Sequence, residues 1–162
     1  MIYIAILVVI GIVIAVVESL FLNSRNIDDT NINKNAEYYK KELMTASELK
    51  FYNTLKELES NYKIVPQVCL NSIMKNNKKY NTELYKIVDF GIFSNDYSEL
   101  LLLIELNDDT HNLKKRKIRD KKVKEMCEKA GIELMTFYTK YPNNRDYVIT
   151  RIKESIYKST NK

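Results

Sequence analysis

The pattern of hydrophobic and polar residues in this chain is organised around one stretch, Leu100–His111. Leu100–Ile104 is a run of five apolar residues bounded on both sides by polar, turn-like sequence. A run of this length between such boundaries predicts a strand that is buried on both faces. The strand ends in Glu105, and Asn107 points to the same side because side chains two apart share a face. A buried carboxylate is costly alone, so we expect a cation, a metal ion or several donors beside Glu105. The alternative is a core strand that ends in an ordinary solvated turn.

A second strand is predicted just before this run, over Tyr85–Phe93. Its apolar residues alternate, and Asp89 interrupts one of its apolar faces. A short turn over residues 94–98 predicts that the two strands pair as an antiparallel hairpin. Asp89 and Glu105 would then converge from neighbouring strands.

The other predicted elements surround this hairpin from residue 42 onward. Thr45 and Glu48 have the spacing of a capping box, Pro66 indicates an edge strand or two short strand pieces, and Gly131 is suited to end a helix. The predicted order is a helix over 46–61, an edge strand over 63–73, the two strands above, a helix over 113–130, a strand over 132–138 and a closing helix over 143–158. The expected buried helical positions are Phe51, Leu55, Leu58 and Tyr62, then Val123, Met126, Cys127 and Ala130, then Tyr147, Val148, Ile152 and Ile156.

The N-terminal part of the chain has a different composition. Residues Ile2–Val17 carry no charge, and a helix over 2–22 would extend for roughly 30 Å, so residues 1–22 are predicted to be a single transmembrane helix. A cleaved signal peptide is the rival interpretation, but no Lys or Arg precedes the run and no small-residue cleavage site follows it. Basic residues follow the run and none precedes it, which predicts a cell-membrane protein whose remaining chain lies on the cytoplasmic side. Residues 23–41 are predicted to be a flexible tether and residues 42–162 a folded domain.

Composition and charge narrow the classes of function. The 162 residues include 3 Gly and 2 Pro, which excludes collagen-like and low-complexity chains. The net charge of +5 is compatible with nucleic acid or an anionic membrane surface as partner. Cys69 and Cys127 lie in apolar contexts without metal-ligand spacing, which predicts reduced thiols. Basic side chains concentrate in the first half of the 113–130 helix, which contains eight basic residues and one acidic residue, Asp120. This half is either a phosphate-contacting surface or a solvated basic face.

Several short segments resemble a known bacterial family. The segments are Thr45–Tyr52, Pro66–Val68, Val88–Phe90, Ile104–His111, Arg119–Asp120 and Gly131–Leu134. They resemble the domain of unknown function 2726 family, which is similar to very-short-patch-repair endonucleases within the PD-(D/E)XK superfamily. The resemblance covers about residues 42–138. It implies an α/β, restriction-endonuclease-like core of a helix, a three-strand meander, a helix and a strand, here with a C-terminal helix and the N-terminal transmembrane helix added.

The resemblance also implies site residues. Asp89 and Glu105 would bind Mg²⁺ or Mn²⁺ with help from the Leu106 carbonyl, and the ion would polarise a phosphodiester and activate water. Glu48 would lie nearby as an acid of the first helix, and His111 would serve proton transfer or support the leaving group. The positions expected to contact nucleic acid are Arg116, Arg119, Lys121 and Lys124.

The sequence departs from the superfamily pattern at two positions. Asn107 stands where the superfamily has lysine, and Thr136 stands where a basic residue is expected. Three hypotheses follow. The first is a membrane-anchored, metal-dependent nuclease that acts on DNA. The second is a catalytically inactive nuclease fold that binds nucleic acid or a protein at the membrane. The third is an envelope-associated structural protein whose basic helix faces anionic lipid.

Overall fold

The computed structural model describes residues 11–19, 36–77, 82–107 and 114–160, with the side chains of residues 114–117 excepted. The chain divides into two compact units, residues 1–41 and residues 42–162. Each unit is described below by itself.

The N-terminal unit corrects the prediction of a membrane anchor. Its described helical segment covers residues 11–19. Within the described residues, no helix has both the length and the apolar character needed to cross a membrane. The predictions of a transmembrane helix over residues 1–22 and of localisation at the cell membrane are therefore wrong. Residues 1–10 and 20–35, which include most of the predicted tether, lie outside the described residues.

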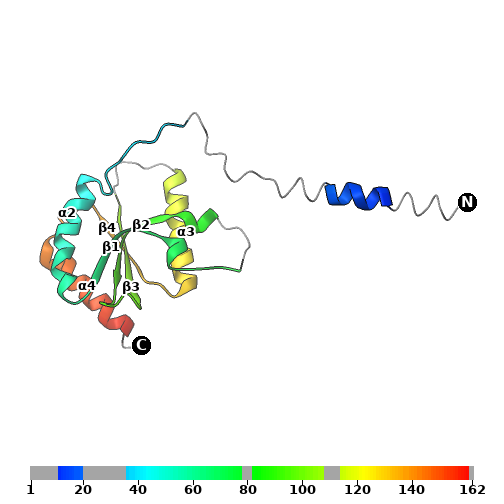
Figure 1. Ribbon diagram of the computed structural model, residues 1–162. Helices are drawn as coiled ribbons and strands as arrows, with labels where there is room; N and C mark the ends of the chain where they lie inside the picture. The colour runs from blue at the N-terminus through cyan, green and yellow to red at the C-terminus, as the bar shows by residue number, and fades with distance from the viewer. Residues whose placement is uncertain (1–10, 20–35, 78–81, 108–113, 161–162) are drawn as a thin grey trace, which may run out of the picture. The chain divides into compact units, whose positions relative to one another are not determined.

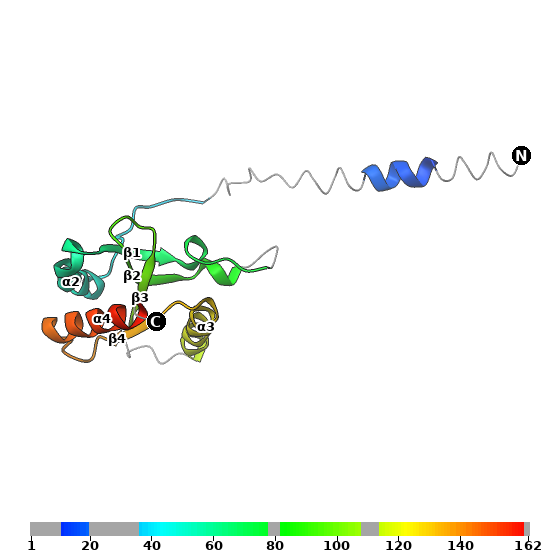
Figure 2. The ribbon, with the colours of Figure 1, turned by 90° about the horizontal axis from the view of Figure 1, so that it is seen from below.

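The second unit is an α/β domain built on a four-stranded mixed sheet in the order β1-β2-β3-β4. The first three strands form an antiparallel meander, and β4 pairs in parallel with β3. Figure 1 and Figure 2 show α2 and α4 on one face of the sheet and α3 on the other. The elements are α2 (Ala46–Leu55), η1 (Lys56–Ser60), β1 (Lys63–Cys69), η2 (Leu70–Ser72), η3 (Thr82–Tyr85), β2 (Ile87–Phe93), β3 (Leu100–Asn107), α3 (Lys114–Ala130), β4 (Leu134–Tyr138) and α4 (Arg145–Thr160).

Two hydrophobic clusters hold these layers together, one on each face of the sheet. Alternate β3 side chains enter opposite clusters: Ile104 packs toward α2 and α4, whereas Leu103 packs toward α3. Both side chains are fully buried, as the apolar run of β3 predicts. The α3 face is the one on which the polar site lies. Burying a large aliphatic side chain stabilises the fold by about 1.5–3 kcal/mol, so these clusters fix β3 between two layers.

The predicted order of elements from residue 42 is confirmed, with differences at the ends of elements. The first helix ends at Leu55 and continues as the 3₁₀ segment η1. The capping box of Thr45 and Glu48 is present, and β1 is an edge strand. Ala130, the last residue of α3, is exposed, whereas Val123 and Cys127 of the same helix are buried. Tyr147 is 53% exposed, and Ile149 takes the buried position instead.

Candidate functional site

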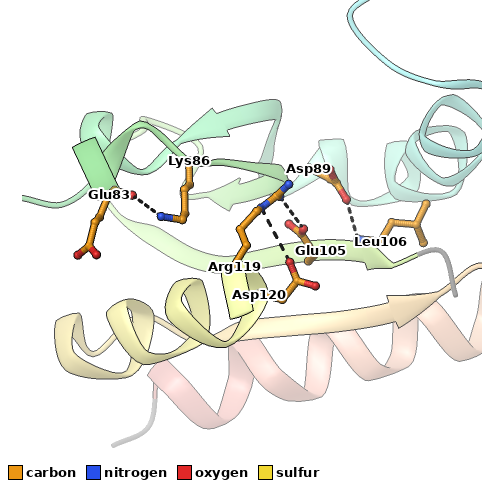
Figure 3. Close-up of polar contacts among 7 residues, drawn as sticks. All are labelled: Glu83, Lys86, Asp89, Glu105, Leu106, Arg119 and Asp120. Atoms are coloured by element: carbon orange, nitrogen blue, oxygen red, sulfur yellow. Dashed lines mark hydrogen bonds and ion pairs between the residues drawn. The ribbon is translucent and has the colours of Figure 1, made fainter. Parts of the chain in front are cut away.

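The site begins where β2 and β3 separate. Their antiparallel pairing runs from Phe93 and Leu100 as far as Phe90 and Ile104, and the next residue on each side is an acid. The Leu106 N–H donates to Oδ2 of Asp89 at 2.7 Å, in place of a carbonyl on the neighbouring strand (Figure 3). A buried backbone donor needs such a partner. The Asp89 side chain therefore lies between β2 and β3 at the point where their pairing ends.

Asp89 and Glu105 lie on the same face of the sheet, toward α3. Leu103 belongs to the cluster under α3, and Glu105 is two residues farther along the same strand. Figure 3 shows the Asp89, Glu105 and Arg119 side chains gathered between the strands and α3. The charge of Asp89 also raises the pKa of Glu105, which requires the two carboxylates to be close. The hairpin thus brings these two acids together.

Glu105 has one paired and one unpaired oxygen. Its Oε1 accepts a hydrogen bond from Nη2 of Arg119 at 3.4 Å, and the side chain is 14% exposed. Its Oε2 is buried and has no hydrogen-bond partner among the described residues. Burial and the charge of Asp89 raise the pKa of Glu105 to about 7, although Arg119 and the Asp89 amide act in the opposite direction. A buried carboxylate oxygen without a donor is the kind of atom that a cation would satisfy.

Asp89 has a similar electrostatic environment. Burial is the largest cause that raises its pKa to about 6, and the Leu106 N–H opposes that rise. The charge and side chain of Glu48 raise this pKa further, whereas Arg119 lowers it. Two acids with raised pKa values on one sheet face are typical of a functional site, although ion-pair networks also produce such shifts.

Glu48 reaches this cluster from the start of α2. Its Oε2 accepts the Thr45 N–H at 2.6 Å, and its own N–H donates to Oγ1 of Thr45 at 3.3 Å. Both halves of the capping box are therefore made. Glu48 lies beside Asp89 while one of its oxygens is committed to the helix cap.

The residues present can be compared with what a divalent cation requires. Mg²⁺ usually binds through one or two carboxylates and keeps several waters or substrate phosphate oxygens. Asp89 and Glu105 supply two carboxylates, and no described residue donates a hydrogen bond to Oε2 of Glu105. Within the described part of the chain, no group of three or more His, Cys, Asp or Glu side chains is arranged to hold a metal ion. The residues therefore fit a Mg²⁺ or Mn²⁺ site that water and phosphate complete, and they do not form an all-protein cage.

The basic helix α3 begins beside these acids. Arg119 pairs with Glu105 and lies 3.9 Å from Asp120, with its side chain 45% exposed. Lys121 is 78% exposed and pairs with Glu125, and Lys124 is 71% exposed and pairs with Glu128, at distances of 3.8 and 3.9 Å. Exposed pairs of this kind are weak, so a phosphate can compete for these lysines.

Three predicted positions remain to be placed. Asn107 is the last residue of β3, and its backbone carbonyl accepts the Thr139 N–H at 2.9 Å. His111 and the side chain of Arg116 lie outside the described residues. Thr136 of β4 pairs with Glu105, so it adjoins the acids.

Two neighbours of the site were not predicted from the sequence to be site residues. Asp120 raises the pKa of Glu105, and the adjacent Arg119 was the signal that could have revealed it. Gln67 of β1 has a φ of 55°, and its neighbours pair with Phe90 and Val88, so its register position is opposite Asp89. A positive φ is uncommon for residues other than glycine, and no sequence pattern indicates it here.

The fold and the acids define an α/β domain with paired, partly buried carboxylates next to a basic helix. The sequence matches the family described as "Protein of unknown function (DUF2726)" over residues 40–159. The chain therefore belongs to the DUF2726 family, as its sequence segments predicted. No curated protein and no solved structure gives a significant match to it.

Proposed function

We propose that this chain is a divalent-metal-dependent hydrolase that acts on phosphodiester bonds of DNA. The observation that carries the proposal is Oε2 of Glu105, which lies buried beside Asp89 and Arg119 with no hydrogen-bond partner among the described residues. Leaving such an oxygen unpaired in a folded protein is costly, and a bound cation would remove that cost. The arrangement joins a place for a cation to a nearby positive charge for a phosphate.

The element order supports the finer assignment to the PD-(D/E)XK superfamily, in the neighbourhood of very-short-patch-repair endonucleases. A helix precedes an antiparallel meander, a second helix follows, and β4 then pairs in parallel with β3. Asp89 lies on the second strand and Glu105 on the third, as that resemblance implies. Proteins that share a fold often differ in function, so the two acids support the assignment more strongly than the topology does.

Each side chain has a role within this proposal. Asp89 and Glu105 hold the cation, which when bound polarises the phosphodiester and lowers the pKa of water. Arg119 neutralises charge on the phosphate, and Lys121 and Lys124 attract the DNA backbone without regard to sequence. His111 serves proton transfer to the leaving group. These roles need the Arg119 guanidinium to remain near Glu105, where its Nη2 lies 3.4 Å from Oε1.

The test is cleavage of supercoiled plasmid by the 162-residue chain with Mg²⁺ or Mn²⁺ and with EDTA. Glu105→Ala and Asp89→Asn should lower metal-dependent nicking by a hundredfold or more. Glu99→Gln is a matched control, because Glu99 is exposed at the other end of β3. Equal nicking by the parent chain and Glu105→Ala would show that the activity is a contaminant and would refute catalysis.

One observation favours a second candidate, a catalytically inactive fold that binds nucleic acid or a protein. Asn107 occupies the position of the superfamily lysine on the same strand and face as Glu105. A neutral amide orients water but does not stabilise developing negative charge as an ammonium does. DNA retardation in a gel without any metal-dependent nicking would select this second function over the first.

A further inference from the structure

Two exposed tyrosines and a lysine form a separate cluster just after β4. The tyrosine pair, Tyr138 and Tyr141, has ring centroids 6.3 Å apart at an interplanar angle of 85°. Nζ of Lys140 lies 5.4 Å from the Tyr138 centroid and 5.1 Å from that of Tyr141. The two tyrosines are 38% and 58% exposed. Neither ring belongs to the two hydrophobic clusters, so packing of the core does not account for them.

The turn that carries the tyrosine pair is fixed by hydrogen bonds. The Tyr141 N–H donates to the Tyr138 carbonyl at 3.1 Å, and Nδ2 of Asn143 donates to the same carbonyl at 2.9 Å. Asn143 has a φ of 35°, a conformation in which asparagine is over-represented. The backbone therefore holds both aromatic rings in place at the surface, which lowers the entropy cost of binding a planar ligand there.

The strand register places the tyrosine pair close to the acids. Tyr138 pairs with Asn107, and Thr136 pairs with Glu105, on adjacent parallel strands. Side chains two apart share a face, so Tyr138 projects from the same face as Glu105. Two residues along a strand and one strand across give a Cα separation of about 8 Å. Bases along one DNA strand are spaced by about 3.4 Å, so this separation corresponds to two or three base steps.

We propose that the tyrosine pair is a stacking surface for an unpaired base of single-stranded DNA. The base would lie within about three nucleotides of the phosphate at Asp89 and Glu105, so this inference deepens the proposed function and rests on it. Every base has a flat π-face that an aromatic ring can stack on, and the Lys140 ammonium supplies charge for the adjoining phosphate. Bases inside a duplex are already stacked, so the partner is single-stranded or frayed DNA.

The test separates base stacking from attraction to phosphates. Fluorescence anisotropy in EDTA measures binding of the 162-residue chain to a labelled oligothymidine strand and to an abasic strand of equal length and charge. Tyr141→Leu keeps an apolar side chain but removes the ring, and Tyr138→Leu does the same on β4. We expect each change to weaken oligothymidine binding about fivefold or more and to leave abasic binding unchanged. Lys140→Gln should weaken binding to both the oligothymidine strand and the abasic strand.

Tyr97→Leu is the matched control, because Tyr97 is 59% exposed and lies in the turn before β3, at the opposite end of that strand. The proposal of a stacking surface would be overturned if the tyrosine substitutions left oligothymidine binding intact. It would also be overturned if they weakened binding to the oligothymidine and abasic strands equally. An equal loss in Tyr97→Leu would overturn it as well. Base-dependent binding together with absent plasmid nicking would support the stacking surface and refute only the hydrolase.

Discussion

Glu105→Gln is the change that tests the electrostatics of the site most directly. Glutamine has nearly the same shape as glutamate, so the substitution removes the charge and preserves the side-chain volume. Burial raises the pKa of Glu105 in the folded chain to about 7, from an ordinary value of 4.5. Between these two values the folded chain binds more protons than the unfolded chain, so stability falls as pH rises through this range. The glutamine variant loses that contribution to the pH dependence.

The size of the effect follows from the pKa shift. Each pKa unit corresponds to about 1.4 kcal/mol, so the shift to about 7 makes the charged form of Glu105 cost about 3 kcal/mol at pH 8. Part of this cost has already appeared by pH 5, so the variant should gain about 2.5 kcal/mol of stability relative to the parent chain between pH 5 and pH 8. For a chain of this size that difference corresponds to about 5–10 °C in Tm. Comparing two pH values cancels any pH-independent cost of burying the amide.

The assay is urea unfolding followed by circular dichroism at pH 5, 6.5 and 8, with EDTA present throughout. Glu99→Gln serves as the control, because it removes one carboxylate from an exposed position. We expect the control to keep the pH dependence of the parent chain. Identical pH dependence in the parent and Glu105→Gln would refute the reasoning, since Glu105 would then carry no buried, costly charge for a cation to offset.

Three further predictions concern the same site. Mg²⁺ at a hundred times its Kd should stabilise the parent chain by about 2–3 kcal/mol at pH 8 and leave Glu105→Gln unchanged in thermal melts. Asn107→Lys should raise Mg²⁺-dependent plasmid nicking tenfold or more, because it restores a cation beside the reacting phosphate; unchanged nicking would contradict that role. Arg119→Gln should lower stability at pH 8 by up to about 1 kcal/mol in urea titrations, since Arg119 lowers the pKa of both acids and is partly exposed.

The hairpin shows what periodicity can predict. Alternation over β2, the apolar run of β3 and the short turn between them gave the antiparallel pairing, and with it the proximity of Asp89 and Glu105. The end of the β2–β3 pairing beside Leu106 was not predictable, because no local sequence pattern shows where the hydrogen bonds between two strands stop. The pairing of Glu105 with Arg119 likewise depends on how α3 packs on the sheet.

Helical periodicity was a less reliable guide to which side chains are buried. Ala130 fits the helical period of Val123 and Cys127, yet it is exposed at the end of α3, whereas the other two are buried. Tyr147 lies beside Val148 in sequence, but its ring packs edge-on against Phe137 and remains half exposed. Periodicity gives the direction of a side chain, whereas the length of the packed surface decides whether that side chain is covered.

The capping box links the start of α2 to the acids and limits what Glu48 can do. Its Oε2 accepts the Thr45 N–H at 2.6 Å, and losing such a cap costs about 1 kcal/mol. Glu48 nevertheless raises the pKa of Asp89, so its charge acts on the site without leaving the helix. A cation at Asp89 and Glu105 would be attracted by this third negative charge while Glu48 stays in its cap. Glu48 is thus better suited to strengthen a two-carboxylate site through its charge than to serve as its third ligand.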